Sequence, residues 1–345
     1  MSDFSSLKIA IFGAGSIGCY VGGQLASIGA DVIFLGRPAY QKALRENGLT
    51  LTHFSKKPLH IKPDSFRFTV SAKDISHSHI IIVSVKSQDS TAAAKTLAQH
   101  AHKDAVIISF QNGVANAEVL RKHLPGHIVL GAVVPFNVTG KGEGVFHSGT
   151  DGDLTIEAHT VPVLSKLQAA FLAADQGCAV SENIEAVQWG KLLVNLNNAL
   201  NTLSGGTLYE GLIQRNYRKA MADMVEEAHG IVLGAGITPA PFGQADPEKM
   251  IKTLRLPNIA YKSIMNSIVK IDKRARSSML DDLEAGRPSE IDYLQGEIVS
   301  LAQKTQQKAP INKAVLERVN TVFKNAHSPR LSGKDIYRLV RDAKA

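Results

Sequence analysis

A stripe of polar side chains with one lysine is the part of this sequence best suited to proton transfer. Residues spaced three or four apart share one helix face, and in the segment "IEAVQWGKLLVNLNNALNTLSGG" these are Gln188, Lys191, Asn195, Asn198 and Thr202. Asparagine is a poor helix former, so four asparagines in one helix indicate hydrogen-bonding roles. A lysine desolvated among amides has a lowered pKa and can donate a proton near neutral pH. The spacing alone leaves both a catalytic face and a solvated face open.

A glycine-rich stretch near the start of the chain could hold the phosphates of a dinucleotide. Its glycines have the G-x-G-x-x-G spacing and follow an apolar run from Leu7 to Phe12. One glycine permits a sharp turn, one lets the backbone approach a pyrophosphate and one allows close packing, while the helix start aims free amides at the anion. We therefore expect the turn to bind the cofactor through Gly13, Ala14, Gly15, Ser16, Ile17 and Gly18. A tight turn without a ligand is the alternative.

The elements around these residues alternate between strand and helix. Apolar periodicity predicts a strand, turn, helix and strand over residues 7–35, and Gly22 and Gly23 in the helix indicate close backbone packing. Runs at 80–85 and 105–110 predict buried strands on either side of a helix at 90–100. Shorter alternations predict strands that complete the same sheet, at 128–134, 144–147 and 154–157.

Three polar residues follow predicted strands. Ligands of parallel sheets bind outside the carboxyl ends of the strands, where the chain carries Arg37, Lys86 and Asn112. Lys86 and Asn112 are candidates for contacting cofactor or substrate, or are ordinary loop residues. The second strand ends in Arg37 with no carboxylate beside it, and a basic residue there can pair with the extra phosphate of NADP. We therefore expect NADPH as the cofactor; an exposed surface arginine is the other interpretation.

Beyond about Val180 the pattern becomes helical, with periodic segments at 184–203, 220–233, 263–283 and 291–305. The prediction is an α/β Rossmann-type N-terminal domain, residues 1–180, followed by an all-α C-terminal domain, residues 181–345. In the last of these segments, Ser289 is the expected N-cap and Glu290 lies in the first turn, where the helix dipole favours a carboxylate. On these grounds alone Glu290 has a structural explanation.

Composition narrows the class of protein. The chain has 345 residues, a formal net charge of +8 and 6% aromatic residues. Its basic residues are scattered apart from an enriched tail after Lys324, and no aromatics interleave with them, so we expect no nucleic-acid partner. We find no signal peptide and no membrane-spanning run, which predicts a cytoplasmic protein. Cys19 and Cys178 are expected to be reduced structural thiols.

The order and distances of several motifs resemble the ketopantoate reductase (2-dehydropantoate 2-reductase) family. After the glycine turn and Arg37 these motifs are "VKSQD", "QNGV", "WGKLLVN" and "SSMLDDLEAGRPSEIDY". The resemblance covers residues from Lys8 to about Phe323 and leaves out the basic tail. It implies NADPH-dependent reduction of 2-dehydropantoate (ketopantoate) to pantoate, in pantothenate and coenzyme A biosynthesis, with the ligands bound between the two domains. A homodimer is the candidate assembly, although the sequence does not decide it.

The resemblance also implies roles for individual residues. Lys191 would be the general acid, and Glu290 would position the lysine and contact the ligands. Asn112 would orient both cofactor and substrate, and Lys86 would lie on the cofactor side. The remaining substrate contacts would come from Asn195, Asn198 and Ser278.

One departure keeps the substrate open. The family often has a second helix asparagine eight positions after the lysine, where this chain has Ala199, with Asn197 and Asn198 nearby. A reductase of another 2-oxo acid therefore remains an alternative, as does a non-catalytic NADPH-binding sensor. The twelve histidines form no HExxH motif or comparable ligand spacing, so no metal is expected.

Overall fold

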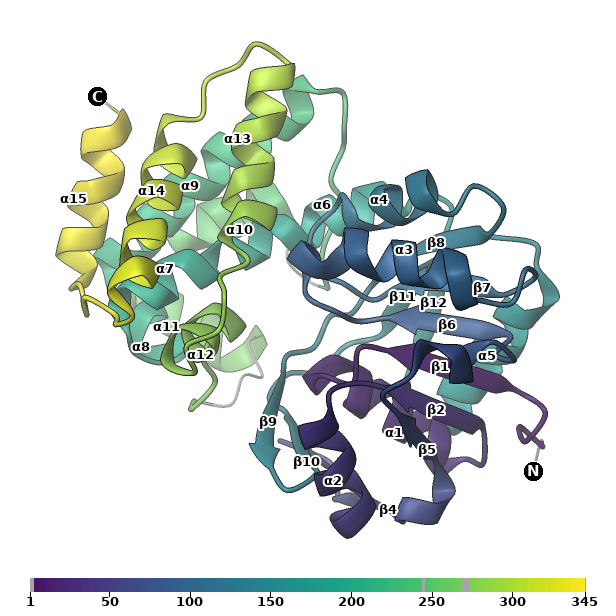
Figure 1. Ribbon diagram of the computed structural model, residues 1–345. Helices are drawn as coiled ribbons and strands as arrows, with labels where there is room; N and C mark the ends of the chain where they lie inside the picture. The colour runs from purple at the N-terminus through teal and green to yellow at the C-terminus, as the bar shows by residue number, and fades with distance from the viewer. Residues whose placement is uncertain (1–2, 244–245, 269–272, 345) are drawn as a thin grey trace. The chain divides into compact units, whose positions relative to one another are not determined.

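The computed structural model describes residues 3–243, 246–268 and 273–344 (Figure 1). The chain divides into two compact units, Met1–Ile184 and Glu185–Ala345. The first unit contains β-sheets with flanking helices. In the second unit, the regular elements of the described residues are all helices.

An eight-stranded sheet lies at the centre of the first unit, in the order β12-β11-β8-β7-β6-β1-β2-β5. The six strands from β8 to β5 are parallel, and β11 pairs antiparallel with β8. A parallel sheet is covered on both faces, which explains near-continuous apolar strands. The strands are β1 (Lys8–Phe12), β2 (Asp31–Leu35), β5 (Arg67–Thr69), β6 (Ile80–Val83), β7 (Val106–Ser109), β8 (Ile128–Val133), β11 (Leu154–Glu157) and β12 (Cys178–Ser181).

A second, four-stranded sheet corrects one strand prediction. The strand expected at 144–147 does not complete the main sheet: it is β10 (Val145–Ser148), in a sheet of order β4-β3-β10-β9. Its partners are β3 (Leu49–His53) and β9 (Val138–Gly142), and β4 (Leu59–Ile61) pairs with β3. Alternating apolar residues identify a strand but carry no information about which sheet it joins.

Helices cover both faces of the main sheet. Leu97 of α3 and Leu120 of α4 pack in one core cluster with Ile107 of the sheet. Leu25 of α1 and Leu167 of α5 belong to the cluster on the other face. The helical segments of this unit are α1 (Ser16–Ser27), α2 (Pro38–Asn47), α3 (Ser90–His100), α4 (Asn116–His123) and α5 (Pro162–Ala173), with short 3-10 turns η1 (Pro63–Ser65), η2 (Ala72–Ile75) and η3 (Ser87–Asp89).

Two adjacent glycines let helix α1 fit between the two sheets. A Cβ on Gly22 would lie 2.4 Å from the ring of Phe34 in the main sheet. A Cβ on Gly23 would lie 3.1 Å from Leu51 in the small sheet. The expectation of close backbone packing is therefore confirmed, and each glycine packs against a different sheet. This packing holds the N-terminus of α1 in place at the end of β1.

The second unit is a set of helices in which α9 contacts α10, α13, α14 and α15. The helical segments of its described residues, starting from the helix at the boundary, are α6 (Ile184–Asn195), α7 (Asn197–Ser204), α8 (Leu208–Leu212), α9 (Arg215–Gly234), α10 (Pro247–Leu254), α11 (Asn258–Ile268), α12 (Ser278–Glu284), η4 (Ile291–Tyr293), α13 (Gln295–Lys304), α14 (Pro310–Asn325) and α15 (Gly333–Lys344). The basic tail is thus largely helix α15, whose Ile336 and Val340 are fully buried.

Three predicted helices are each divided in the structure. The helix expected at 184–203 is α6 and α7, separated at Leu196. The segment 263–283 contains the end of α11 and most of α12, with residues 269–272 outside the described part. The segment 291–305 starts with η4, and Ser289 is not its N-cap: that position belongs to Glu290, while the Ser289 hydroxyl accepts a hydrogen bond from the Ile291 amide at 3.0 Å.

Glu227 supplies a testable link within the helical unit. Its carboxylate accepts hydrogen bonds at 2.9 Å from the amides of Ile311 and Asn312 in the first turn of α14, whose N-cap residue Ala309 offers no side-chain bond. Because charge-assisted bonds are replaced by unpaired amides, we expect Glu227→Ala to lower the free energy of unfolding by about 2 kcal/mol. Urea denaturation monitored by circular dichroism would measure this.

The neighbouring Glu226 is a matched control. Its exposed carboxylate pairs with Arg255 at 2.6 Å, and a surface ion pair contributes little. We expect Glu226→Ala to cost less than about 1 kcal/mol. Equal losses for the two variants would contradict the capping role of Glu227.

Candidate active site

The glycine turn joins β1 to α1, and two of its glycines are required by the fold. Gly13 has a φ of +111°, and a Cβ on it would lie 2.8 Å from the backbone nitrogen of Val85. A Cβ on Gly18 would lie 2.3 Å from the carbonyl oxygen of Gly13. The amides of Gly13 and Ala14 both donate to the carbonyl oxygen of Leu35 at 3.0 Å. These contacts attach the turn to the end of β2.

Gly15 has a different environment. Its backbone is extended, with φ −90° and ψ −166°, and a Cβ there would find no atom within 4 Å. Gly15 is the N-cap of α1 and has no side chain to bond the helix start. The geometry of a helix leaves the amides of Ser16, Ile17 and Gly18 without an intrahelical acceptor. Open space beside these amides suits a pyrophosphate, so the turn fits the group that its spacing predicts.

The carboxyl ends of four parallel strands place the other polar candidates of this unit. Arg37 lies two residues after the end of β2, Lys86 three residues after the end of β6, and Asn112 three residues after the end of β7. Since β2, β1, β6 and β7 are neighbours and parallel, these residues lie at the edge of the sheet that carries the glycine turn. Arg37 is exposed, whereas Lys86 and Asn112 are half-buried.

The carboxylate of strand β2 lies at the opposite end of the strand from Arg37. Asp31 begins β2, and it accepts a hydrogen bond from Arg67 of β5 at 2.9 Å. The basic Arg37 therefore stands at the strand end where an acidic residue would accept hydrogen bonds from a ribose.

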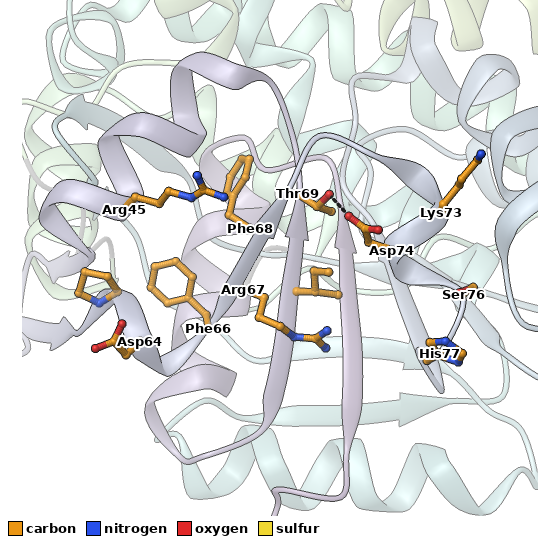
Figure 2. Close-up of a pocket in the computed structure, with 12 residues that line it drawn as sticks. Arg45, Asp64, Phe66, Arg67, Phe68, Thr69, Lys73, Asp74, Ser76 and His77 are labelled. Atoms are coloured by element: carbon orange, nitrogen blue, oxygen red, sulfur yellow. Dashed lines mark hydrogen bonds between the residues drawn. The ribbon is translucent and has the colours of Figure 1, made fainter.

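A hollow of about 670 Å³ lies elsewhere on the first unit, beside β5 (Figure 2). Its lining mixes basic residues such as Lys73 with acidic ones such as Asp64, and a hydrogen bond joins Thr69 to Asp74. None of the residues predicted from the sequence lines it. This hollow is therefore not part of the candidate site, which is defined by the predicted cofactor and substrate residues.

Lys191 and Glu290 interact within the helical unit, although they are far apart in the sequence. Lys191 is half-buried, and burial lowers the pKa of its ammonium to about 8. The negative charge of Glu290 opposes this shift, because it favours the protonated lysine. Glu290 is 8% exposed, just before η4. An ammonium with a pKa near 8 is mostly protonated at neutral pH and can give up its proton.

The polar stripe is divided between half-buried and fully buried positions. Gln188, Asn195 and Asn198 are half-buried on α6 and α7, whereas Thr202 is fully buried and its hydroxyl donates to the Asn198 carbonyl at 2.9 Å. Asn197, outside the stripe, accepts a bond from the Tyr217 hydroxyl at 2.7 Å. The excess of asparagine therefore has two causes: some of these residues hold the fold, and others remain available to a ligand.

Ser278 is positioned by the residue before it and by α7. Ser277 caps α12 by accepting a hydrogen bond from the Leu280 amide at 3.2 Å. The amide of Ser277 donates to the side chain of Asn201 at 3.0 Å, and its hydroxyl donates to the Asn198 carbonyl at 3.4 Å. Asn198 and the half-buried Ser278 thus lie in segments that are bonded to each other. The sequence did not reveal that Asn201 and Ser277 link α7 to α12. The large number of asparagines in the helix was the signal that could have indicated this link.

Two further features bear on the chemistry. Burial raises the pKa of the Cys19 thiol and raises that of Cys178 to about 12, so neither is a thiolate at neutral pH. Among the described residues, no three His, Cys, Asp or Glu side chains are grouped to hold a metal ion.

None of the helices in the described part of the chain is long and apolar enough to cross a membrane.

Comparison with known proteins decides the family. The model "Ketopantoate reductase PanE/ApbA" matches residues 9–160, and "Ketopantoate reductase PanE/ApbA C terminal" matches residues 183–323. A 2-dehydropantoate 2-reductase of Pyrococcus abyssi is 30% identical over 322 residues, covering 89% of this chain and 94% of that protein. The chain belongs to the ketopantoate reductase family. The resemblance proposed from the motifs is confirmed, and the family is one of oxidoreductases.

Solved structures agree with this assignment. A ketopantoate reductase of the same family from Ralstonia eutropha JMP134 is 28% identical, with a TM-score of 0.78, and covers 92% of this chain and 99% of that one. The predicted fold class, a Rossmann-type α/β domain followed by a helical domain, is confirmed. A D-mandelate dehydrogenase solved with NADH and anilino(oxo)acetate has a TM-score of 0.76 at 20% identity, covers 92% of this chain and 99% of its own, and shows the shared fold.

Proposed function

We propose that this protein reduces 2-dehydropantoate to pantoate with NADPH, the step that serves pantothenate and coenzyme A biosynthesis. The observation that carries the proposal is the pair of Lys191 and Glu290, with the lysine pKa lowered to about 8 by burial. Membership of the ketopantoate reductase family supports the substrate. Its relatives from Pyrococcus abyssi and Pyrococcus horikoshii carry the name 2-dehydropantoate 2-reductase. We also propose a homodimer; a ketopantoate reductase from Staphylococcus aureus with this fold is described as dimeric.

The first unit binds the dinucleotide in this proposal. The amides of Ser16, Ile17 and Gly18 hold the pyrophosphate beside the open space at Gly15. Arg37 pairs with the phosphate that distinguishes NADPH from NADH, and Lys86 adds positive charge on the cofactor side. The reduced dinucleotide, when bound, is the source of the hydride. Asn112 orients cofactor and substrate.

The second unit completes the reduction. A hydride added to the ketone carbon leaves the electron pair of the C=O bond on oxygen, and the Lys191 ammonium stabilises this charge and supplies the proton. Ketone, hydride and proton together give the alcohol. Glu290 keeps the lysine protonated and oriented until then, and contacts the ligands. Ser278 holds the substrate carboxylate, while Asn195 and Asn198 donate hydrogen bonds to its oxygens.

A reductase of another 2-oxo acid is the second candidate. Ala199 stands where the family resemblance leads us to expect an asparagine; its methyl side chain offers the substrate no polar group, and it is fully buried. The fold is shared with a dehydrogenase of a different 2-hydroxy acid, D-mandelate. Which 2-oxo acid the enzyme prefers therefore has to be determined by experiment. A protein that only binds NADPH is a third possible outcome. The presence of Lys191, Ser278 and Glu290 argues against it, because a sensor needs only the residues that bind the dinucleotide.

The deciding experiment follows the loss of reduced-nicotinamide absorbance with purified protein. NADPH and NADH are each combined with ketopantoate and with a panel of branched, straight-chain and aromatic 2-oxo acids. Turnover of ketopantoate with NADPH at the highest kcat/KM supports the proposal. Efficient turnover of only another acid reassigns the substrate, and binding of NADPH without any turnover supports a sensor.

Cofactor preference has its own prediction at Arg37. We expect Arg37→Asp to raise the Kd of NADPH at least about tenfold, since a charge-assisted phosphate contact is replaced by repulsion. The Kd of NADH should change less than about threefold, because NADH lacks that phosphate. Nicotinamide fluorescence titration measures both. Arg45→Asp is the control, because Arg45 is an exposed arginine of helix α2, which begins directly after Arg37; an equal effect at Arg45 would mean that only net charge matters.

A further inference from the structure

A chain of buried hydrogen bonds lies beneath the strand ends that carry Lys86 and Asn112. Four of its members come from the 3-10 turn η3, the starts of α3 and α4 and the loop after β7, and each is 6% exposed or less: Ser87, Ser90, Asn116 and Gln111. The Ser109 hydroxyl of β7 joins the chain by donating to the side-chain oxygen of Gln111 at 3.0 Å. None of them was singled out from the sequence. A buried polar side chain costs free energy unless it is hydrogen-bonded, so four together at this edge of the sheet need an explanation.

The two amides in the chain fix the direction of every bond. The side-chain NH₂ of Gln111 donates to the Ser90 hydroxyl at 2.7 Å, and that hydroxyl donates to the side-chain oxygen of Asn116 at 2.7 Å. The NH₂ of Asn116 donates to the Ser87 hydroxyl at 3.0 Å, which in turn donates to the carbonyl oxygen of Asn112 at 3.2 Å. Removing the Ser90 hydroxyl takes one bond from the Gln111 NH₂ and one from the Asn116 side-chain oxygen. Removing the Ser87 hydroxyl takes one bond from the Asn116 NH₂ and one from the Asn112 carbonyl oxygen.

Both neighbours of Lys86 are held by this chain. Gln111 donates its second side-chain hydrogen to the carbonyl oxygen of Val85 at 3.1 Å, and Ser87 is held by Asn116. The carbonyl of Asn112 accepts from Ser87 and also from the NH₂ of Asn116, at 2.5 Å. The backbone at Lys86 and at Asn112 is therefore fixed by one set of bonds, although the residues follow different strands.

The same loop also contacts the glycine turn. The Ser84 hydroxyl donates to the carbonyl oxygen of Gly13 at 2.8 Å. The backbone nitrogen of Val85 lies so close to Gly13 that a Cβ there would approach within 2.8 Å. Val85 is thus shared between the hydrogen-bond chain and the turn proposed to hold the pyrophosphate. Through it, the chain of bonds reaches the three loops that follow β1, β6 and β7 at this edge.

We propose that Ser87, Ser90, Gln111 and Asn116 are positioning residues that set Lys86 and Asn112, against the glycine turn, for the dinucleotide and the 2-oxo acid. This inference rests on the proposed function. The four side chains are buried and act through Lys86 and Asn112 without touching either ligand. A ligand-binding group gains affinity when its geometry is fixed before binding, because less conformational freedom is then lost.

The first test compares two buried serines. Ser90→Ala interrupts the chain in the middle, and Ser78→Ala is the control, since Ser78 is 4% exposed and lies outside the chain. We expect Ser90→Ala to raise both the Kd of NADPH and the KM of the 2-oxo acid about five- to tenfold. The pH at which kcat falls should stay unchanged, because Lys191 supplies the proton from the other unit. Ser87→Ala removes another link and should have the same signature, so that the outcome can be read from whichever variant folds.

A second test asks whether the effect passes through the two site residues. In a background that carries both Lys86→Ala and Asn112→Ala, adding Ser90→Ala should change the Kd of NADPH by less than about twofold. An undiminished effect in that background would overturn the inference. So would a Ser90→Ala protein that melts at a lower temperature but binds and turns over its ligands as the wild type does. Failure of the proposed function is a separate result: the unmodified protein would then neither bind NADPH nor reduce any 2-oxo acid.

Discussion

Replacing Lys191 by alanine will lower kcat for reduction about a hundred- to ten-thousandfold, the range for loss of a general acid. Binding of NADPH should persist, because the residues proposed to hold the phosphates of the dinucleotide belong to the first unit. Stopped-flow absorbance gives kcat, and nicotinamide fluorescence gives the Kd of NADPH. A variant with unchanged kcat would reject Lys191 as the acid, and loss of NADPH binding would show that its role is not confined to proton donation.

The pH dependence separates proton donation from charge. The Lys191 pKa is lowered to about 8, so the protonated fraction falls as pH rises through that value. We expect kcat for reduction to be flat below pH 8 and to fall about tenfold per unit well above it. Lys191→Arg keeps the positive charge but holds its proton throughout this range. If charge stabilisation alone mattered, the arginine variant would retain most of the activity and show no fall above pH 8.

The strands that position the cofactor residues could be predicted because a strand buried on both faces consists of consecutive apolar residues. Ile80–Val83 is apolar at every position, as a strand covered on both faces must be. Once such strands are parallel, the residues after them meet at one edge without any further information. The predicted positions of Arg37, Lys86 and Asn112 at that edge agree with the structure for this reason.

The break between α6 and α7 could not be predicted, because its cause lies a hundred residues away. Neither proline nor glycine occurs near Leu196, and the apolar periodicity continues across it. The side-chain NH₂ of Gln295, a fully buried residue of α13, donates to the carbonyl oxygen of Leu196 at 2.9 Å. That carbonyl is held by a tertiary contact, and tertiary contacts override local helix propensity. The break lies between Lys191 and Asn198, within the predicted polar stripe.

Glu290 shows the same limit at a single residue. From its neighbours, a carboxylate at a helix start has a sufficient electrostatic explanation. The structure instead makes it the N-cap residue of a 3-10 turn, 8% exposed, with its charge acting on Lys191. Only the motif resemblance suggested this partner, because spacing along the chain carries no information about contacts between residues so far apart.

Replacing Gly15 by alanine will weaken dinucleotide binding without weakening the fold. The backbone of Gly15 is one that alanine adopts readily, and the added Cβ would meet no atom within 4 Å. Such a substitution leaves stability unchanged or raises it by about 0.4 to 1 kcal/mol, because the unfolded chain loses freedom. The methyl group would project into the space that the pyrophosphate needs. Loss of its charge-assisted bonds to the helix amides should raise the Kd of NADPH about ten- to a hundredfold.

Two other glycines make this prediction specific. Gly126→Ala also adds a methyl group to open space, but in the exposed loop between α4 and β8; like Gly15→Ala it should not lower stability, and it should leave the Kd of NADPH unchanged. Gly18→Ala would place a Cβ 2.3 Å from the Gly13 carbonyl oxygen, so it should lower the melting temperature and affinity together. Calorimetry and fluorescence titration on the three variants distinguish these causes. If Gly15→Ala binds NADPH as tightly as the wild type does, the pyrophosphate does not lie against this turn, and the proposed cofactor site is wrong.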